Sequence, residues 1–157
     1  MNVDNHTISL LVKNKPDVLA RISGLLSAKG FNIENISANV TMNPDITKIT
    51  MVAKGDTATI VKIEKEMKKL IDVVDVLRVK SKIAIQREMA LVRVKIDRKT
   101  RDDVIKSLDP LQCRVLDESS DRLVLEMTGE TAEIDQALVS LEALGMEDMS
   151  RSGVVVL

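Results

Sequence analysis

Apolar residues in the first thirty positions change their spacing at one point, and that change separates two elements. A short apolar run at 8–12 is typical of a strand, and the turn signature Asn-Lys-Pro-Asp at 14–17 ends it. Beyond the turn, apolar residues recur at helical spacing on one face, namely Val18, Leu19, Ile22, Leu25 and Leu26. Pro16 suits the first helical position, and Gly30 suits a left-handed stop. We therefore predict a strand, a tight turn and an amphipathic helix.

The following fifty residues complete one folding unit. Residues 31–42 predict a second strand and residues 46–53 a third, on either side of a turn at 43–45. Asp56 offers a helix cap, and a second amphipathic helix is predicted from its apolar face, Ile60, Ile63, Met67 and Leu70. A fourth strand covers 72–79. The order β-α-β-β-α-β predicts a four-stranded antiparallel sheet with two helices on one face.

The second half of the chain repeats this order with little residue identity. Its predicted elements are residues 89–96, 100–108, 112–116, 123–127, 130–144 and 151–157, of which the second and fifth are helices. Gly145 is expected to stop the long helix. We predict an α+β fold of two ferredoxin-like domains, residues 1–80 and 89–157, joined by a linker at 81–88. Units of this size have small cores, which favours oligomerisation through an open sheet edge.

The composition narrows the possible partners. Phe31 is the single aromatic residue, so no aromatic platform for stacking bases exists, and the formal net charge of −1 comes without a basic cluster. We expect protein or small-molecule partners, with no nucleic acid and no membrane. The lone Cys113 cannot form an intrachain disulfide, and no apolar run has the length of a membrane span. These features predict a cytoplasmic protein.

No set of residues has the pattern of a catalytic or metal site. His6 is the single histidine and has no cysteine at ligand spacing, and the six glycines form no phosphate-loop motif. A small acylphosphatase-like enzyme shares the predicted topology, and Arg21 with Asn39 would be its candidate site residues. The glycine-rich loop that such a site needs before the helix is missing. We expect no catalytic residue, no metal and no cofactor in this chain.

The turn at 14–17 allows two interpretations. The backbone N–H groups at a helix start are unpaired and face a positive dipole end, so they can bind the carboxylate of a small ligand. Alternatively, Asn14 and Asp17 only cap the helix and hydrogen-bond the turn. On the pattern alone we favour capping.

Longer matches to a known family go beyond topology. The motif Asn14-x-Pro16, the segment Val-Leu-Ala-Arg-Ile at 18–22, Gly-Leu-Leu at 24–26 and Lys-Gly-Phe-Asn-Ile-Glu at 29–34 resemble the small regulatory subunit of acetolactate synthase (acetohydroxyacid synthase) and its ACT domain. Met-Ala-Leu-Val-Arg-Val at 89–94 and Arg-Ser-Gly-Val-Val at 151–155 resemble the second domain of that family. The resemblance spans nearly the whole chain.

This resemblance implies a non-catalytic subunit that forms a homodimer through its ACT domains. It would bind and activate the catalytic subunit, which would carry thiamine diphosphate, Mg and FAD, and would mediate feedback inhibition by valine or a related branched-chain amino acid. The implied effector site comprises Asn14, Asp17, Val18 and Leu19, with Asn32 and Ile33 of the partner subunit. Ala38 and Asn39 are weaker candidates. An ACT-type amino-acid sensor that controls another enzyme is the alternative.

One residue departs from the family pattern. Where the family usually has glycine after the proline, this chain has Asp17. An aspartate carboxylate at the helix start can satisfy the same amides and dipole that a ligand carboxylate would use, and it repels that ligand. We therefore expect valine to inhibit weakly or not at all while activation is kept. In the less favoured alternative, Asp17 binds the ammonium group of the effector.

Overall fold

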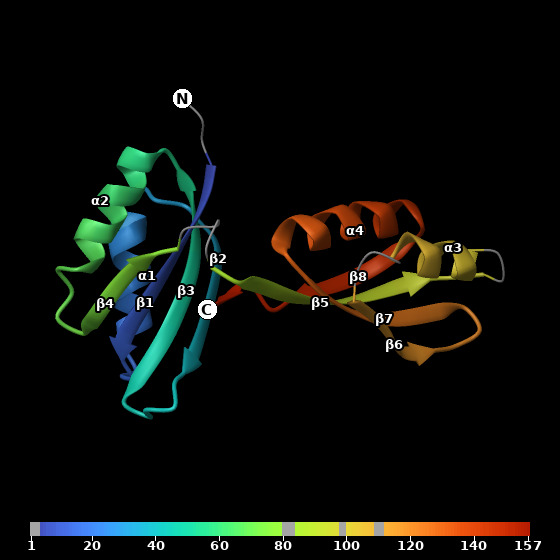
Figure 1. Cartoon of the computed structure of the whole chain (residues 1–157), viewed down its shortest axis with the longest axis horizontal. Helices are drawn as coiled ribbons and strands as arrows, with labels where there is room; N and C mark the ends of the chain where they lie inside the picture. Colours follow the sequence, from blue (N-terminus) through green and yellow to red (C-terminus); the bar gives the residue numbers. More distant parts are fainter. Residues whose placement is uncertain (1–3, 80–83, 98–99, 109–111) are drawn as a thin grey trace. The chain divides into compact units, whose positions relative to one another are not determined.

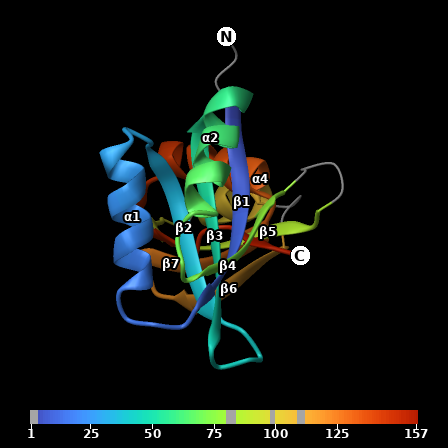
Figure 2. The same ribbon diagram turned by 90° about the vertical axis from the view of Figure 1, so that its left-hand side faces the viewer.

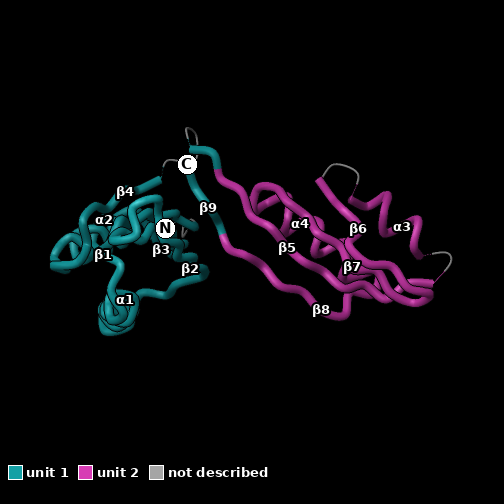
Figure 3. The backbone as a smooth tube through the Cα atoms, turned by 90° about the horizontal axis from the view of Figure 1, so that it is seen from below, with its two compact units in different colours: residues 1–85, 154–157 teal, residues 86–153 magenta. Residues whose placement is uncertain are grey.

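The computed structural model describes residues 4–79, 84–97, 100–108 and 112–157 and divides the chain into two compact units. Unit 1 is Met1–Ile85 with Val154–Leu157, and unit 2 is Gln86–Gly153 (Figure 3). The sequence pattern predicts domains at 1–80 and 89–157, which places the last four residues in the second domain. The structure instead groups these four residues with the first unit.

Unit 1 has the predicted β-α-β-β-α-β order. Its elements are β1 (Asp4–Lys13), α1 (Val18–Ala28), β2 (Ile33–Val40), β3 (Ile46–Gly55), α2 (Thr57–Met67) and β4 (Val73–Arg78), with the two-residue β9 (Val155–Val156) at the chain end. The first four strands form an antiparallel sheet in the order β2-β3-β1-β4. Both helices cover one face of this sheet (Figures 1 and 2). This confirms the ferredoxin-like fold predicted for the first domain.

The core of unit 1 lies between the two helices and the sheet. Its buried side chains come from alternate strand positions and from one face of each helix: Ile8, Leu10, Val12, Val18, Ile22, Leu26, Ile49, Met51, Ala53, Ile60, Ile63, Met67 and Val76. Leu19 was expected on the inner face of α1, yet 44% of its surface is exposed. The apolar face of α1 is therefore narrower than the pattern predicted.

Two of the three residues predicted to begin or end the helices of unit 1 have the expected role. The Asp56 carboxylate accepts a hydrogen bond from the Thr59 backbone N–H at 2.7 Å and so caps α2. Gly30, at φ +70°, adopts the left-handed conformation expected beyond α1. The placement of Pro16 at the first helical position is wrong, because Asp17 is the N-cap of α1 and Pro16 precedes it.

Unit 2 is the second ferredoxin-like domain. Its elements are β5 (Gln86–Lys95), α3 (Thr100–Ser107), β6 (Gln112–Glu118), β7 (Arg122–Gly129), α4 (Thr131–Ala143) and β8 (Met146–Arg151), with the strands in the order β6-β7-β5-β8. Val92, Leu125 and Leu141 are among its fully buried side chains. Cys113 packs against this core, and burial raises the pKa of its thiol.

Two element predictions in the second half need correction. Of the predicted tail strand at 151–157 only Val155–Val156 forms a strand (β9), and the strand directly after Gly145, Met146–Arg151, was not predicted. Most of this edge strand is exposed, so its sequence carries no alternating apolar signal. The predicted linker at 81–88 also ends too late, because β5 begins at Gln86 and Glu88 is buried within it. Residues 81–83 of that linker lie outside the described residues.

Candidate effector site

Asn14 connects the β1–α1 turn to the neighbouring β2–β3 turn. Its backbone N–H donates to the Asp45 carbonyl at 2.7 Å, and its side-chain Nδ2 donates to the Pro44 carbonyl at 2.8 Å. The Thr47 hydroxyl donates to Asn14 Oδ1 at 3.1 Å. Asn14 therefore holds two turns together and does not cap α1. The backbone N–H and the side-chain amide of Asn14 already make hydrogen bonds within the chain. Any ligand at this turn must therefore bind the residues that follow Asn14.

The start of α1 keeps unpaired backbone donors. Asp17 has right-handed helical geometry (φ −96°, ψ −4°), and its carboxylate makes no capping hydrogen bond. The carboxylate instead forms an ion pair with Arg21, one helical turn further on. Within the described part of the chain, no hydrogen bond involves the backbone N–H of Leu19 or Ala20. The capping interpretation is thus wrong for this helix, and these two N–H groups can donate hydrogen bonds to an anion.

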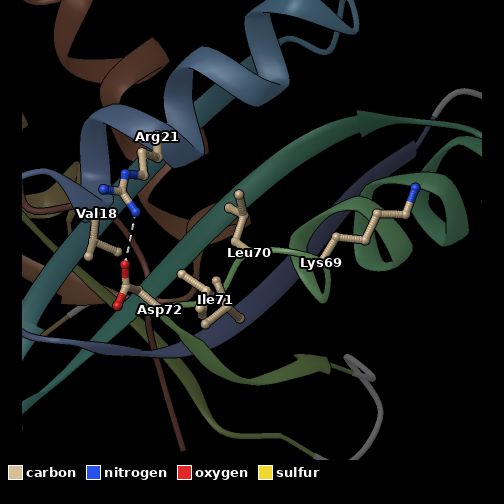
Figure 4. A pocket seen from close by; sticks show the side chains of 7 residues that line it. Val18, Arg21, Lys69, Leu70, Ile71 and Asp72 are labelled. Atoms are coloured by element: carbon tan, nitrogen blue, oxygen red, sulfur yellow. Dashed lines mark hydrogen bonds and ion pairs between the residues drawn. The ribbon is translucent and has the colours of Figure 1, made fainter.

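A buried carboxylate lies beside this helix start. Asp72 has a side chain only 8% exposed and accepts a hydrogen bond from Lys15 Nζ at 3.1 Å. Arg21 Nη1 donates to the other carboxylate oxygen at 3.0 Å (Figure 4). Lys13 Nζ lies 3.9 Å from Asp72 Oδ1. The hydrogen bond from Lys15 and the charges of these three side chains lower the pKa of Asp72 against the opposing effect of burial. Asp72 therefore ties the end of β1 and the first turn of α1 to the segment before β4.

A hollow of about 220 Å³ adjoins the same helix turn (Figure 4). Its lining residues are Val18, Arg21, Lys69, Leu70, Ile71, Asp72 and Val73. The two lining cations are occupied, since Arg21 pairs with Asp17 and Asp72 while Lys69 pairs with Glu66. The hollow offers aliphatic surface to a ligand, and two of its lining residues, Val18 and Arg21, flank the unpaired backbone N–H groups of α1 in the chain.

The structure brings together only some of the predicted site residues. Asp17 and Leu19 are exposed at the helix start, but the Val18 side chain is 4% exposed and belongs to the core, so only its backbone can face a ligand. Asn32 and Ile33 follow the other end of α1, which at 1.5 Å per residue is about 16 Å long. Asn32 donates to Glu34 at 2.8 Å. The two groups of predicted residues therefore flank opposite ends of α1 within one chain.

The sequence reasoning missed Lys13, Lys15 and Asp72. Lys15 and Asp72 are 57 positions apart, and no local pattern links them. The one available signal was the place of Asp72 at the start of the fourth predicted strand, 72–79, which in this topology lies next to the end of the first strand. Arg21, proposed for the acylphosphatase-like alternative, is held by two carboxylates, and Asn39 lies on β2 opposite Lys48.

Among the described residues, no group of three or more histidine, cysteine, aspartate or glutamate side chains could hold a metal ion. No helix in the described ranges is long and apolar enough to cross a membrane.

The fold and this turn define the class of the protein. Two ferredoxin-like units, the first with an open strand-to-helix turn, constitute a two-domain protein of the ACT type. Residues 8–75 match the family model of the AHAS small subunit-like ACT domain, and residues 87–157 match that of the small subunit of acetolactate synthase. The chain belongs to the acetolactate synthase small-subunit family, which is a family of regulatory subunits.

Individual relatives agree with this assignment. The acetolactate synthase small subunit of Mycolicibacterium smegmatis is 35% identical over 150 residues, which cover 96% of this chain and 88% of the relative. The probable small subunit of Methanothermobacter thermautotrophicus is 36% identical over 154 residues, 98% of this chain and 92% of the relative. The crystal structure of the small subunit from Thermotoga maritima superposes with a TM-score of 0.88 at 29% identity and covers 98% of this chain and 96% of that one.

Proposed function

We propose that this chain binds the catalytic subunit of acetolactate synthase in the cytoplasm, raises its activity, and carries feedback control by valine or another branched-chain amino acid. The observation that supports an effector site is the start of α1, where the unpaired amides of Leu19 and Ala20 lie in the chain between Val18 and Arg21, two residues that line an aliphatic hollow. The chain itself would use no cofactor. Thiamine diphosphate, Mg and FAD would belong to the catalytic subunit.

The helix start can recognise an amino acid by its carboxylate. Backbone N–H groups in the first turn of a helix, together with the positive end of the helix dipole, attract a carboxylate without a side-chain cation. This matters here because Arg21 and Lys69 are already paired. The aliphatic wall formed by Leu70 and Ile71 suits a branched hydrocarbon side chain.

A second copy of the chain can complete the site. The edges of the unit 1 sheet are β2 and β4, and the hydrogen bonds of Asn14 to Asp45 and Pro44 place the β1–α1 turn near the end of β2. If two β2 strands pair antiparallel about a two-fold axis, the end of one strand lies opposite the start of the other. The turn of one subunit would then face Asn32 and Ile33 of the partner subunit. A homodimer through β2 therefore brings the two halves of the predicted site together.

Asp17 should weaken this effector site. Its backbone has φ −96°, which any residue adopts, so the family glycine is explained by close ligand approach and not by backbone conformation. The Asp17 carboxylate stands in the first turn beside the free amides, where it disfavours a second carboxylate. The ion pair with Arg21 offsets part of this repulsion. We infer weak or absent inhibition by valine with activation retained.

The proposal is tested by titrating purified catalytic subunit with this chain and measuring acetolactate formation, with and without valine. We expect no product from this chain alone, and a saturable rise in rate when it is added to the catalytic subunit. An unchanged rate would contradict the proposal. If the isolated chain nevertheless bound valine, the free-standing sensor would replace it.

A further inference from the structure

The helix-free face of the unit 1 sheet is crossed by the last four residues of the chain, Val154–Leu157 (teal in Figure 3). Three side chains of the sheet bind their backbone. Asn35 Oδ1 accepts from the Val154 N–H at 3.3 Å, Ser37 Oγ donates to the Val154 carbonyl at 3.0 Å, and Lys48 Nζ donates to the Val156 carbonyl at 2.6 Å. The tail is thus held through its main chain by residues of β2 and β3.

The far end of the tail is also paired. Leu157 and Ile85 exchange two backbone hydrogen bonds of 3.0 Å each, which joins β9 to the residue immediately before β5. Val154 is 3% exposed, so the tail also buries apolar surface. A hollow of about 360 Å³ continues along this face, with Leu77, Val156 and Leu157 among its lining residues. The face therefore has both polar anchors and apolar surface for an extended segment.

Two polar residues of the sheet confirm that this face is covered. Ser9 and Thr50 pair across β1 and β3 on the side opposite the helices, yet they are only 7% and 3% exposed. Strand residues on a sheet face without helices normally face water. Ser9 also lines the hollow that Val156 and Leu157 line, which places the tail next to it.

We propose that this face is a binding site for an extended peptide strand, and that residues Val154–Leu157 of this chain are its occupant. Because the anchors bind backbone N–H and C=O groups, the site recognises an extended main chain with small apolar side chains rather than one sequence. Unit 1 is then incomplete without the end of the chain. Gly153, at φ +77°, redirects the backbone immediately before the bound segment. This inference is independent of the proposed enzyme partner and effector.

The test compares the full chain with a chain that ends at Gly153, using hydrogen exchange of β1 and β3 and the binding of a fluorescent peptide Ser-Gly-Val-Val-Val-Leu (residues 152–157). Removing the tail breaks its hydrogen bonds to three side chains of the sheet, which should speed amide hydrogen exchange in β1 and β3 by at least about tenfold. The added peptide should bind the shortened chain, restore its protection, and fail to bind the full chain. A peptide with proline in place of Val154 should not bind, because proline has no N–H to donate to Asn35.

Full-length variants provide a second route should the shortened chain aggregate. The double variant Asn35→Ala with Ser37→Ala should increase exchange and proteolysis at the tail, whereas Ser23→Ala is a matched control whose hydroxyl only bonds its own helix. The proposal is overturned if the double variant exchanges like the control, if the shortened chain keeps full protection, or if the full chain binds the peptide equally well.

Discussion

Arg151 holds the buried carboxylate of Glu88 through two parallel hydrogen bonds, from Nε to Oε1 at 2.6 Å and from Nη2 to Oε2 at 2.8 Å. The remaining Nη1 group donates to Asp135 at 2.7 Å. This geometry joins β5, α4 and β8 of unit 2 at one point. Glu88 is 3% exposed, so its charge depends on Arg151 for compensation.

We predict that Arg151→Met lowers the free energy of unfolding of unit 2 by about 3–5 kcal/mol, because it leaves the Glu88 carboxylate buried and unpaired. Adding Glu88→Leu should recover most of this loss, since the pair is then replaced by apolar groups. Urea unfolding followed by circular dichroism measures the free energy of unfolding of the single and the double variant. The control is Arg93→Met, which removes an exposed pair with Asp148 and should cost less than about 1 kcal/mol. Equal effects of the two arginine variants would contradict the prediction.

Asp72 should contribute to the acid sensitivity of unit 1. Its pKa in the folded state is lowered from the ordinary 3.8, chiefly by the hydrogen bond from Lys15. A lowered folded-state pKa stabilises the fold above the unfolded-state value, and the contribution disappears as the pH falls through the folded-state value. We predict that Asp72→Asn destabilises unit 1 at pH 7, and that the difference from the native chain shrinks progressively below pH 3.8.

Thermal unfolding of both chains between pH 7 and about pH 2 checks this prediction. Asp45→Asn, in the exposed β2–β3 turn, is the control and should give a curve parallel to that of the native chain. A constant difference between native chain and Asp72→Asn across the whole range would show that Asp72 acts through packing alone.

The proposed dimer makes a prediction about the two sheet edges. Val40 on β2 and Val74 on β4 have nearly equal exposure, 57% and 58%, so they form a matched pair. Val40→Lys should raise the dimer dissociation constant by at least about tenfold, because pairing through β2 would bury two added charges. Val74→Lys should leave it unchanged. Sedimentation velocity decides between the edges, and the reverse result would assign the interface to β4.

Local periodicity was sufficient to predict the interior of both units. Ile60, Ile63 and Met67 are spaced for one helix face, and all three are fully buried in α2. Likewise, the alternation of Ala90, Val92 and Val94 predicted the inner face of β5. These elements follow the pattern because a one-sided core needs one apolar face in each of them.

Other features depend on which segments meet in space, and local pattern carries no information about that. The exposed strand β8 was missed because edge positions tolerate polar residues, and the strand predicted over the whole apolar tail is only Val155–Val156. The cluster around Asp72 combines residues 57 positions apart. At the candidate site, the turn was found from the sequence, but the pairing of Asp17 with Arg21 in place of helix capping was not.

The final prediction concerns Asp17 and the affinity for valine. A charge at a helix end contributes about 0.3–1 kcal/mol when exposed, and 1.4 kcal/mol corresponds to tenfold in affinity. Removing the carboxylate should therefore tighten valine binding by about two- to fivefold, and less where Arg21 already offsets the charge. Loss of the side chain itself adds room for the ligand. We expect Asp17→Gly to bind valine most tightly, Asp17→Asn to be intermediate, and the native chain to be weakest.

Calorimetric titration of valine into the three chains measures this order, and acetolactate formation with the catalytic subunit should show activation by all three. Asp17→Asn separates charge from size, because it keeps the volume of the side chain and removes only its charge. The hypothesis fails if the native chain binds valine as tightly as Asp17→Gly. Tighter binding by the native chain would instead indicate that Asp17 contacts the ammonium group of the effector, since only an attractive contact makes its carboxylate favourable there.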